Sequence, residues 1–282
     1  MFERITSIDD SRVADYRGVS EPHLLRARQL FIAEGRSIVA RLIEEGGWTI
    51  RSVLVNESAR RDLEPALAAA AERVPVFVCA AADFPGITGH DIHRGCLALV
   101  ERPPARLLSA AIVSSRLAVV LDEVGNADNV GGVFRNAAAF GADLVVLSPG
   151  CCSPLYRKAI RTSMGATLRV PFVHLDDGWP DALITMRTAG FVLAALTPRA
   201  PAEPLDEFAR RPMPQRLAVI VGAEGPGLAP SIESSADHRL RIPIAPGVDS
   251  LNLAVATGIA LEQVARNMRG RGILAAPKGT QT

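Results

Sequence analysis

The sequence predicts an α/β protein: a doubly wound parallel sheet in the second half, preceded by a smaller α/β domain. Three observations lead to this class. Segments of helical and strand period alternate from about residue 20 onward. The strands predicted in the second half are unbroken apolar runs rich in β-branched residues, which is typical of parallel strands covered on both faces. The chain has 282 residues and 48% hydrophobic content, enough for one large or two medium-sized domains with a real core.

The first domain is expected over residues 19–104. Apolar residues recur at helical spacing in 31–45, and Gly46 and Gly47 indicate where that helix ends. Residues 52–56, 76–80 and 95–101 are typical of strands, and residues 63–74 of a helix. Two prolines at 103 and 104 mark a change of composition. Residues 105–115 are therefore expected to be a linker, and residues 1–18 an N-terminal extension.

The second domain is expected over residues 116–269, with 270–282 as a flexible tail. Its predicted strands are 117–122, 143–149, 191–197, 217–222 and 239–244, with helices between them and a long helix at the end. In parallel sheets, ligands bind in the loops beyond the carboxyl ends of the strands. Three such loops have suitable compositions: EVGNADNVGG at 123–132, GAEGPGLAPS at 222–231 and APGVDSLN at 245–252.

Composition excludes several classes of protein. The net charge of +1 is not that of a polycation. Neither a secretory signal nor an apolar run of membrane-spanning length is present, which favours a cytoplasmic protein without a membrane partner. The four cysteines, at 79, 96, 151 and 152, lack the spacing of a metal site, so no metal is expected. The phosphate-binding glycine signatures of dehydrogenases and P-loop NTPases are missing.

The first loop leads into a helix with one arginine. Asn129 is a plausible N-cap for a helix beginning at Val130. Arg135 has only glycine and alanine on its own face of that helix, so a ligand or another chain could reach its guanidinium. A solvated helix arginine is an equally good interpretation. The buried stripe of this helix is expected to consist of Val133, Ala137 and Phe140.

The other two loops contribute polar candidates. Glu224 lies among glycines that let the backbone approach a ligand closely, although those glycines could equally serve only to form turns. Ser250 is a natural N-cap for the last helix, and Asn252 would then be its second residue. Leu251, Val255 and Ile259 are expected on the buried face of that helix, with Leu261 and Val264.

A basic cluster follows Pro154. Arg157, Lys158 and Arg161 recur on one side of a predicted helix. A local patch of this kind beside the three loops would suit a phosphate backbone. The alternative is a charged, solvated helix face.

Taken together, the three loops resemble the SpoU/TrmH branch of the SPOUT superfamily, the RNA ribose 2′-O-methyltransferases. NVGGVFRNAAAFG resembles the first motif of that family, VGAEGPGL the second, and IPIAPGVDSLNLAVA the third, in the family's order over roughly residues 116–267. The first half is similar, less specifically, to the family's small RNA-binding domain, which itself resembles a ribosomal protein. FIAEGRSIV is similar to that domain's entry helix, and HRGCLALVE to one of its strands.

This resemblance implies a C-terminal trefoil knot that binds S-adenosylmethionine. By position in the motifs, the implied cofactor contacts are Gly222, Ile242, Leu251, Ile244, Leu147, Ala223 and Gly227. It further implies a homodimer whose active site takes residues from both subunits. RNA contacts are expected from Arg157, Lys158 and Arg161, and from Arg36 and Arg94 in the first domain; Arg94 departs from the glutamine frequent in the family.

The implied activity is methyl transfer to a ribose 2′-hydroxyl of ribosomal or transfer RNA. The resemblance gives Arg135 the role of assisting deprotonation, with Asn129, Glu224, Ser250 and Asn252 orienting it and the ribose. Because a guanidinium stays protonated in water, an alternative is that Arg135 stabilises the alkoxide electrostatically while another group takes the proton. A non-catalytic RNA-binding or ribosome-assembly protein on the same scaffold is the competing hypothesis.

Overall fold

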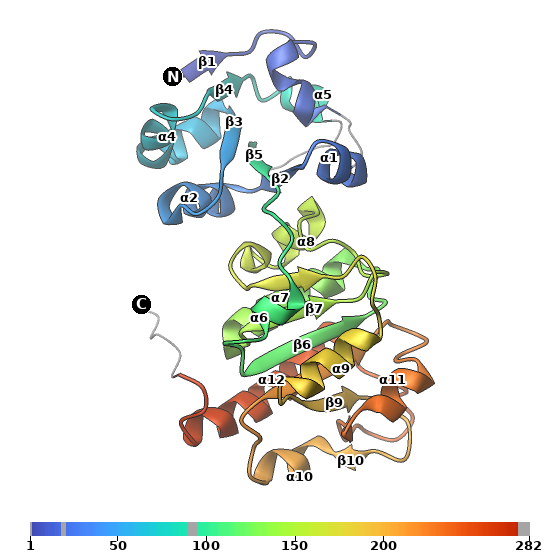
Figure 1. The fold of residues 1–282 in the computed structure, drawn as a ribbon. Coiled ribbons are helices and arrows are strands. Elements are labelled where there is room, and N and C mark those ends of the chain that lie inside the picture. The colour runs from blue at the N-terminus through green and yellow to red at the C-terminus, as the bar shows by residue number, and fades with distance from the viewer. Residues whose placement is uncertain (1, 18–20, 89–94, 276–282) are drawn as a thin grey trace. The chain divides into compact units, whose positions relative to one another are not determined.

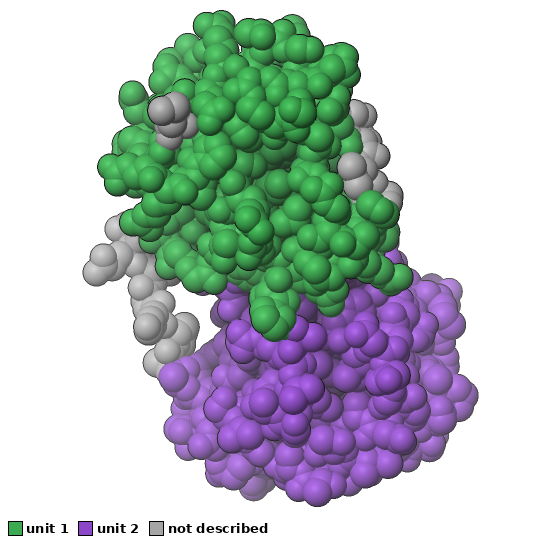
Figure 2. Space-filling view, turned by 45° about the horizontal axis from the view of Figure 1, so that its top comes forward, with its two compact units in different colours: residues 1–104, 155–164 green, residues 105–154, 165–282 purple. Residues whose placement is uncertain are grey.

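The computed structural model describes residues 2–17, 21–88 and 95–275, which form two compact units (Figure 2). The first unit comprises residues 1–104 and 155–164, and the second comprises residues 105–154 and 165–282. The short segment 155–164 is thus flanked on both sides by residues of the second unit and packs with the first. The sequence had suggested one uninterrupted second domain instead.

The first unit is built on a five-stranded mixed sheet in the order β1-β4-β3-β5-β2. Its strands are β1 (Phe2–Arg4), β2 (Leu30–Glu34), β3 (Ile50–Asn56), β4 (Val76–Cys79) and β5 (Cys96–Glu101). Its helices are η1 (Ser11–Tyr16), α1 (Glu21–Ala27), α2 (Arg36–Glu45), α3 (Glu57–Asp62), α4 (Glu64–Ala71), α5 (Phe84–Thr88) and α8 (Arg157–Thr162). Strand β5 pairs antiparallel with both β2 and β3, whereas β4 pairs parallel with both β1 and β3.

Two expectations for this unit were wrong. Residues 1–18 are not an appendage over their described part, because β1 pairs with β4 and the side chains of Val13 and Tyr16 are buried in the core. The segment FIAE, which was compared with an entry helix, is strand β2, and the helix starts only at Arg36. Gly35, with φ at 115°, allows the abrupt change from strand to helix.

The second unit contains a seven-stranded sheet, all parallel, in the order β10-β12-β9-β11-β6-β7-β8 (Figure 1). Its strands are β6 (Leu117–Asp122), β7 (Leu144–Leu147), β8 (Phe172–His174), β9 (Val192–Leu196), β10 (Glu203–Pro204), β11 (Leu217–Gly222) and β12 (His238–Arg241). Its helices are α6 (Leu108–Ala111), α7 (Ala127–Phe140), η2 (Ala166–Leu168), α9 (Asp181–Thr188), α10 (Leu205–Arg210), α11 (Pro230–Ser235) and α12 (Leu253–Gly270). The predicted α/β class with a parallel sheet is confirmed.

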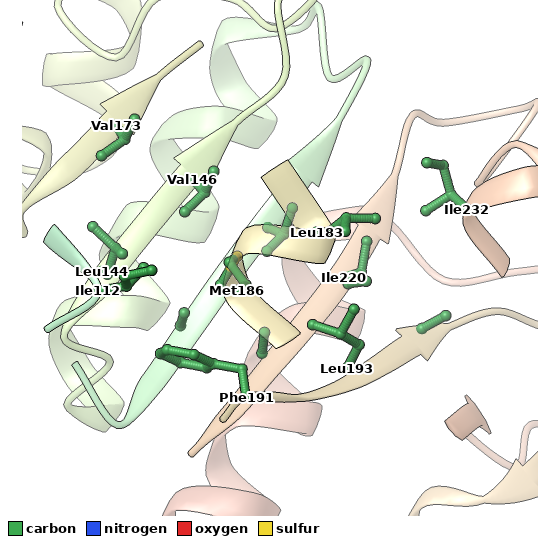
Figure 3. Packing of buried hydrophobic residues seen from close by; sticks show 14 of the residues in the cluster. Ile112, Leu144, Val146, Val173, Leu183, Met186, Phe191, Leu193, Ile220 and Ile232 are labelled. Atoms are coloured by element: carbon green, nitrogen blue, oxygen red, sulfur yellow. The ribbon is translucent and has the colours of Figure 1, made fainter. Parts of the chain in front are cut away.

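Helices cover both faces of this sheet, as the apolar strands require. On one face, Leu183 and Met186 of α9 pack against alternate residues of the central strands, among them Val146 and Ile220 (Figure 3). The opposite face is covered by α7 and α12, which pack against each other and against β7 and β11. Ile112 belongs to the first of these cores, so residues 105–115 are part of the second unit and not a linker.

Helices α7 and α12 approach each other closely because both carry glycine at the contact. A methyl group at Gly132 would lie 2.6 Å from Cβ of Ala254, and one at Gly258 would lie 3.0 Å from Nδ2 of Asn136. Asn136 Nδ2 also donates to the carbonyl of Ala254 at 2.6 Å. Gly132 therefore serves helix packing, a role the sequence did not indicate.

Neither Asn129 nor Ser250, the two predicted N-caps, caps its helix. Helix α7 is capped by Asn126, whose side chain accepts from the amide of Asp128, and Asn129 is buried within the first turn. Helix α12 is capped by Asn252 and not by Ser250. This shift changes the buried face of α12, where Val255 is 52% exposed while Leu253, Thr257 and Leu261 are buried.

None of the described helices is long and apolar enough to cross a membrane.

Candidate cofactor and active site

Three residues predicted from three separate loops meet at Asn252. Its Nδ2 donates to Oδ1 of Asn129 at 3.0 Å and to Oε1 of Glu224 at 2.8 Å. Its Oδ1 accepts from the amides of Ala254 and Val255 at 3.0 and 3.2 Å, which caps α12. One side chain therefore fixes the start of a helix and joins the loops that follow β6 and β11.

A cavity of about 320 Å³ lies beside this cluster, at the carboxyl ends of β9 and β11. Its volume falls at the lower end of the range of small-molecule sites. Of the implied cofactor residues, six line the cavity: Gly222, Ala223, Gly227, Ile242, Ile244 and Leu251. Glu224, Ser250 and Asn252 line it as well.

Leu147 does not belong with these residues. It is fully buried in β7, where it pairs in register with His174, and it is not part of the cavity wall. The wall at the end of β9 is formed by Leu196, Thr197 and Pro198, which were not predicted from the sequence motifs. The carboxyl ends of parallel strands lie at one edge of the sheet. The predicted strand 191–197 therefore implies that the loop after it also lies beside the cavity.

The backbone around the cavity is shaped by two glycines. A methyl group at Gly222 would lie 2.4 Å from the carbonyl carbon of Gly227, so the chain after β11 turns back tightly on the strand end. Gly227 adopts a φ of 70°, and its amide donates to the carbonyl of Ala223 at 3.0 Å. These two glycines therefore bring the backbone of residues 222–227 close together along one wall of the cavity.

Arg135 lies on a different surface. It is exposed on α7 and lines a shallow depression with Gly132, Ala254, Val255 and further residues of α7 and α12. Across the described residues, its guanidinium has neither a hydrogen bond nor an ion pair. The structure thus brings Asn129, Glu224 and Asn252 together and leaves Arg135 beside, not inside, the cavity of its own chain.

Asp122 ends β6 directly opposite Gly222 and was not singled out by the sequence. The residue is 3% exposed, and its carboxyl group accepts from the amide of Ala229 and the indole of Trp179. Burial raises the pKa of Asp122 above its usual range. This buried carboxyl group anchors the far end of the loop that carries Glu224.

The basic residues predicted for RNA are mostly paired with acids of the first unit. Arg157 and Arg161 both contact the buried carboxylate of Glu34, at 3.1 and 3.3 Å. Arg36 contacts Asp62 and donates to Ser58 Oγ. Lys158 is exposed on α8. Arg94 lies outside the described residues.

The fold and the site define an α/β protein with a cofactor-sized cavity at the carboxyl edge of a parallel sheet. The chain belongs to the SpoU rRNA Methylase family, which matches residues 116–262. An uncharacterized tRNA/rRNA methyltransferase of Mycobacterium bovis is 35% identical over 92% of this chain and 90% of its own length.

Solved structures share the fold over nearly the whole chain. An AdoMet-bound rRNA methyltransferase from Sinorhizobium meliloti is 25% identical with a TM-score of 0.81, covering 95% of this chain and 98% of that one. A SpoU methyltransferase from Streptomyces viridochromogenes in complex with AdoMet is 22% identical with a TM-score of 0.75, covering 93% and 100%. The family predicted from the three motifs is confirmed.

Proposed function

We propose that the protein transfers a methyl group from S-adenosylmethionine to a ribose 2′-hydroxyl of ribosomal or transfer RNA. Membership of the SpoU family makes it an RNA methyltransferase. The observation that supports the finer proposal most directly is the junction of Asn129, Glu224 and Asn252 at the rim of the cavity. All three motif loops contribute to it.

S-adenosylmethionine is the cofactor, and the cavity is where it binds in this proposal. Gly222, Ala223 and Gly227 would hold it through main-chain groups, and Ile242, Ile244 and Leu251 would supply apolar contacts. When bound, it would supply an electrophilic methyl group to the ribose oxygen and leave as S-adenosylhomocysteine, while the hydroxyl proton would pass to another group or to water. Glu224 and Asn252 are then close to the reacting atoms and orient the ribose. The cytoplasm, where RNA substrates are made, is the proposed location.

The active form is proposed to be a homodimer. Val255 is 52% exposed at the start of α12 and lies in the same depression as Arg135 and Phe140. An apolar surface next to an unpaired guanidinium fits a second copy of the chain better than open solvent. Pairing through this face would let Arg135 act at the cavity of the partner, where it stabilises the charge developing on the ribose oxygen.

The C-terminal segment is proposed to form a trefoil knot. Supporting this, β12 lies beyond β9 in the sheet, whereas the helix after it, α12, packs on α7 at the other side of β11. The chain from residue 242 to 252 must therefore cross back past the strand ends.

For RNA binding, the exposed Lys158 and Arg161 are the proposed phosphate contacts. Arg157 and Arg36, which are held in ion pairs, would support them.

Replacing Arg135 by Ala tests the assignment. Methyl transfer to RNA is expected to fall at least a hundredfold, because an electrostatic contact of the transition state is worth about 3–4 kcal/mol. Binding of S-adenosylmethionine, measured by calorimetry, should change little. Arg210→Ala is the matched control, because among the described residues it breaks a single exposed ion pair, with Asp206. Unchanged turnover in Arg135→Ala would contradict the role of this residue.

The substrate is tested by mapping 2′-O-methylation across total RNA from cells with and without the gene. One or more ribose methylations should disappear from ribosomal or transfer RNA and return with the wild-type gene but not with Arg135→Ala. Loss of a base methylation instead would contradict the 2′-hydroxyl as acceptor. An unchanged RNA, together with no cofactor binding, would favour the non-catalytic RNA-binding alternative.

A further inference from the structure

The loop of residues 223–228, called here the hairpin loop, lines the cavity and carries Glu224. Among the described residues, the loop has one internal backbone hydrogen bond, from the Gly227 amide to the Ala223 carbonyl. Its middle, Glu224 to Pro226, is exposed. A loop of six residues with so few internal contacts needs an external partner to hold one conformation, because each ordered residue costs about 1–2 kcal/mol in backbone entropy.

Arg199, three residues beyond the end of β9, provides such a partner. Its Nη1 donates to the carbonyl of Leu228 at 3.0 Å, and its Nη2 donates to the carbonyl of Pro226. Within the described part of the chain, no other side chain donates to the main-chain carbonyls of the hairpin loop. The planar guanidinium can reach two carbonyls at once, which an ammonium group cannot do with the same geometry.

The position of Arg199 is itself fixed by a buried carboxylate. Nη1 of Arg199 lies 3.2 Å from Oε1 of Glu233, whose side chain is only 9% exposed. The same oxygen accepts from the hydroxyl of Thr197 at 2.8 Å, and that hydroxyl accepts from the amide of Arg199 at 3.2 Å. Thr197 in turn lines the cavity.

These contacts connect one wall of the cavity to the other through a continuous series of side chains. It runs from Thr197 at the end of β9, through Glu233 of α11 and Arg199, to the hairpin loop after β11. We propose that Arg199 is a positioning residue for cofactor binding, and that it acts with Glu233 by holding the hairpin loop in the conformation that closes the cavity. Arg199 does not line the cavity and need not touch the cofactor.

This inference rests on the proposed function in one respect, namely that the cavity binds S-adenosylmethionine. Arg199→Ala should weaken that binding about tenfold or more, because two donors that preorganise the loop are lost. Arg199→Lys should recover only part of the affinity. Glu233→Gln keeps an acceptor at the same place, removes the charge, and should give a smaller loss than Arg199→Ala.

The experiment combines calorimetric titration of S-adenosylmethionine with amide hydrogen exchange of the full chain. In Arg199→Ala without cofactor, the Gly227 amide should exchange at least tenfold faster, whereas amides within β6 and β11 should keep their protection. Arg210→Ala should match the wild type in both measurements. The double variant Arg199→Ala with Glu233→Gln should lose less binding free energy for S-adenosylmethionine than the sum of the losses in the two single variants, because the two side chains interact directly.

Two outcomes would overturn the proposal. If Arg199→Ala lowered the thermal unfolding temperature but left both the Gly227 exchange rate and the dissociation constant within twofold of wild type, the contacts would serve folding only. If exchange were unchanged, the loop would hold its conformation without Arg199. Failure of the wild type to bind the cofactor would instead count against the proposed function, and the exchange measurement would still decide the role of Arg199.

Discussion

Asn252 combines a helix cap with a junction of three loops, and its two roles can be separated by substitution. Asn252→Ala removes the acceptor for the amides of Ala254 and Val255, which costs about 1 kcal/mol. It also leaves the buried amide side chain of Asn129 without its partner, at about 1–3 kcal/mol. The second unit is therefore expected to lose about 2–4 kcal/mol of unfolding free energy.

Asn252→Ser isolates the second role, because a serine hydroxyl can cap the helix but does not reach Asn129. We expect it to recover about 1 kcal/mol relative to Asn252→Ala. Asn252→Asp keeps the cap as well, but sets a carboxylate against Glu224 and cannot donate. It should therefore lose methyl transfer while retaining much of the stability of the helix end.

Urea unfolding followed by tryptophan fluorescence measures these differences. The chain has two tryptophans, and Trp179 lies in the second unit with its indole on Asp122. A Trp48→Phe background therefore restricts the signal to the second unit. If Asn252→Ser were as unstable as Asn252→Ala, the cap would contribute nothing measurable. A loss below about 1 kcal/mol for Asn252→Ala would refute the whole account of this residue.

Further expectations concern packing, titration and thiol chemistry. Gly132→Ala would set a methyl group 2.6 Å from Cβ of Ala254, so it should cost about 1–3 kcal/mol in urea unfolding; wild-type stability would contradict the close helix contact. Burial raises the pKa of Asp122, so the folded protein keeps this proton to higher pH than the unfolded chain, and its contribution to stability falls as pH rises above about 4. Asp122→Asn should therefore gain stability relative to wild type as the pH rises above about 4, and a difference independent of pH would refute this. Native protein should expose at most one reactive thiol to a disulfide reagent, that of the half-buried Cys152, because burial raises the pKa of the other three; rapid reaction of more than one would contradict the fold.

The sequence predicted the second half of the molecule well where periodicity was strong. The unbroken apolar runs at 117–122 and 217–222 became the central strands, and the loops after them meet as parallel topology requires. Helix starts were less predictable. Asn126 and Asn129, like Ser250 and Asn252, are chemically similar caps two or three residues apart, and local preference does not choose between them.

Residue types and their order alone determined the α/β class, the family and the three loops that carry polar side chains. Only the tertiary structure decided which of those side chains meet, because contacts such as that of Asn252 with Asn129 join residues more than a hundred positions apart in the chain. It also changed the interpretation of Gly132. The sequence suggested that this glycine leaves Arg135 accessible to a ligand, whereas in the structure it is the point at which α12 packs on α7. A sequence records that a residue is small, but only the fold determines which neighbour occupies the space that it leaves.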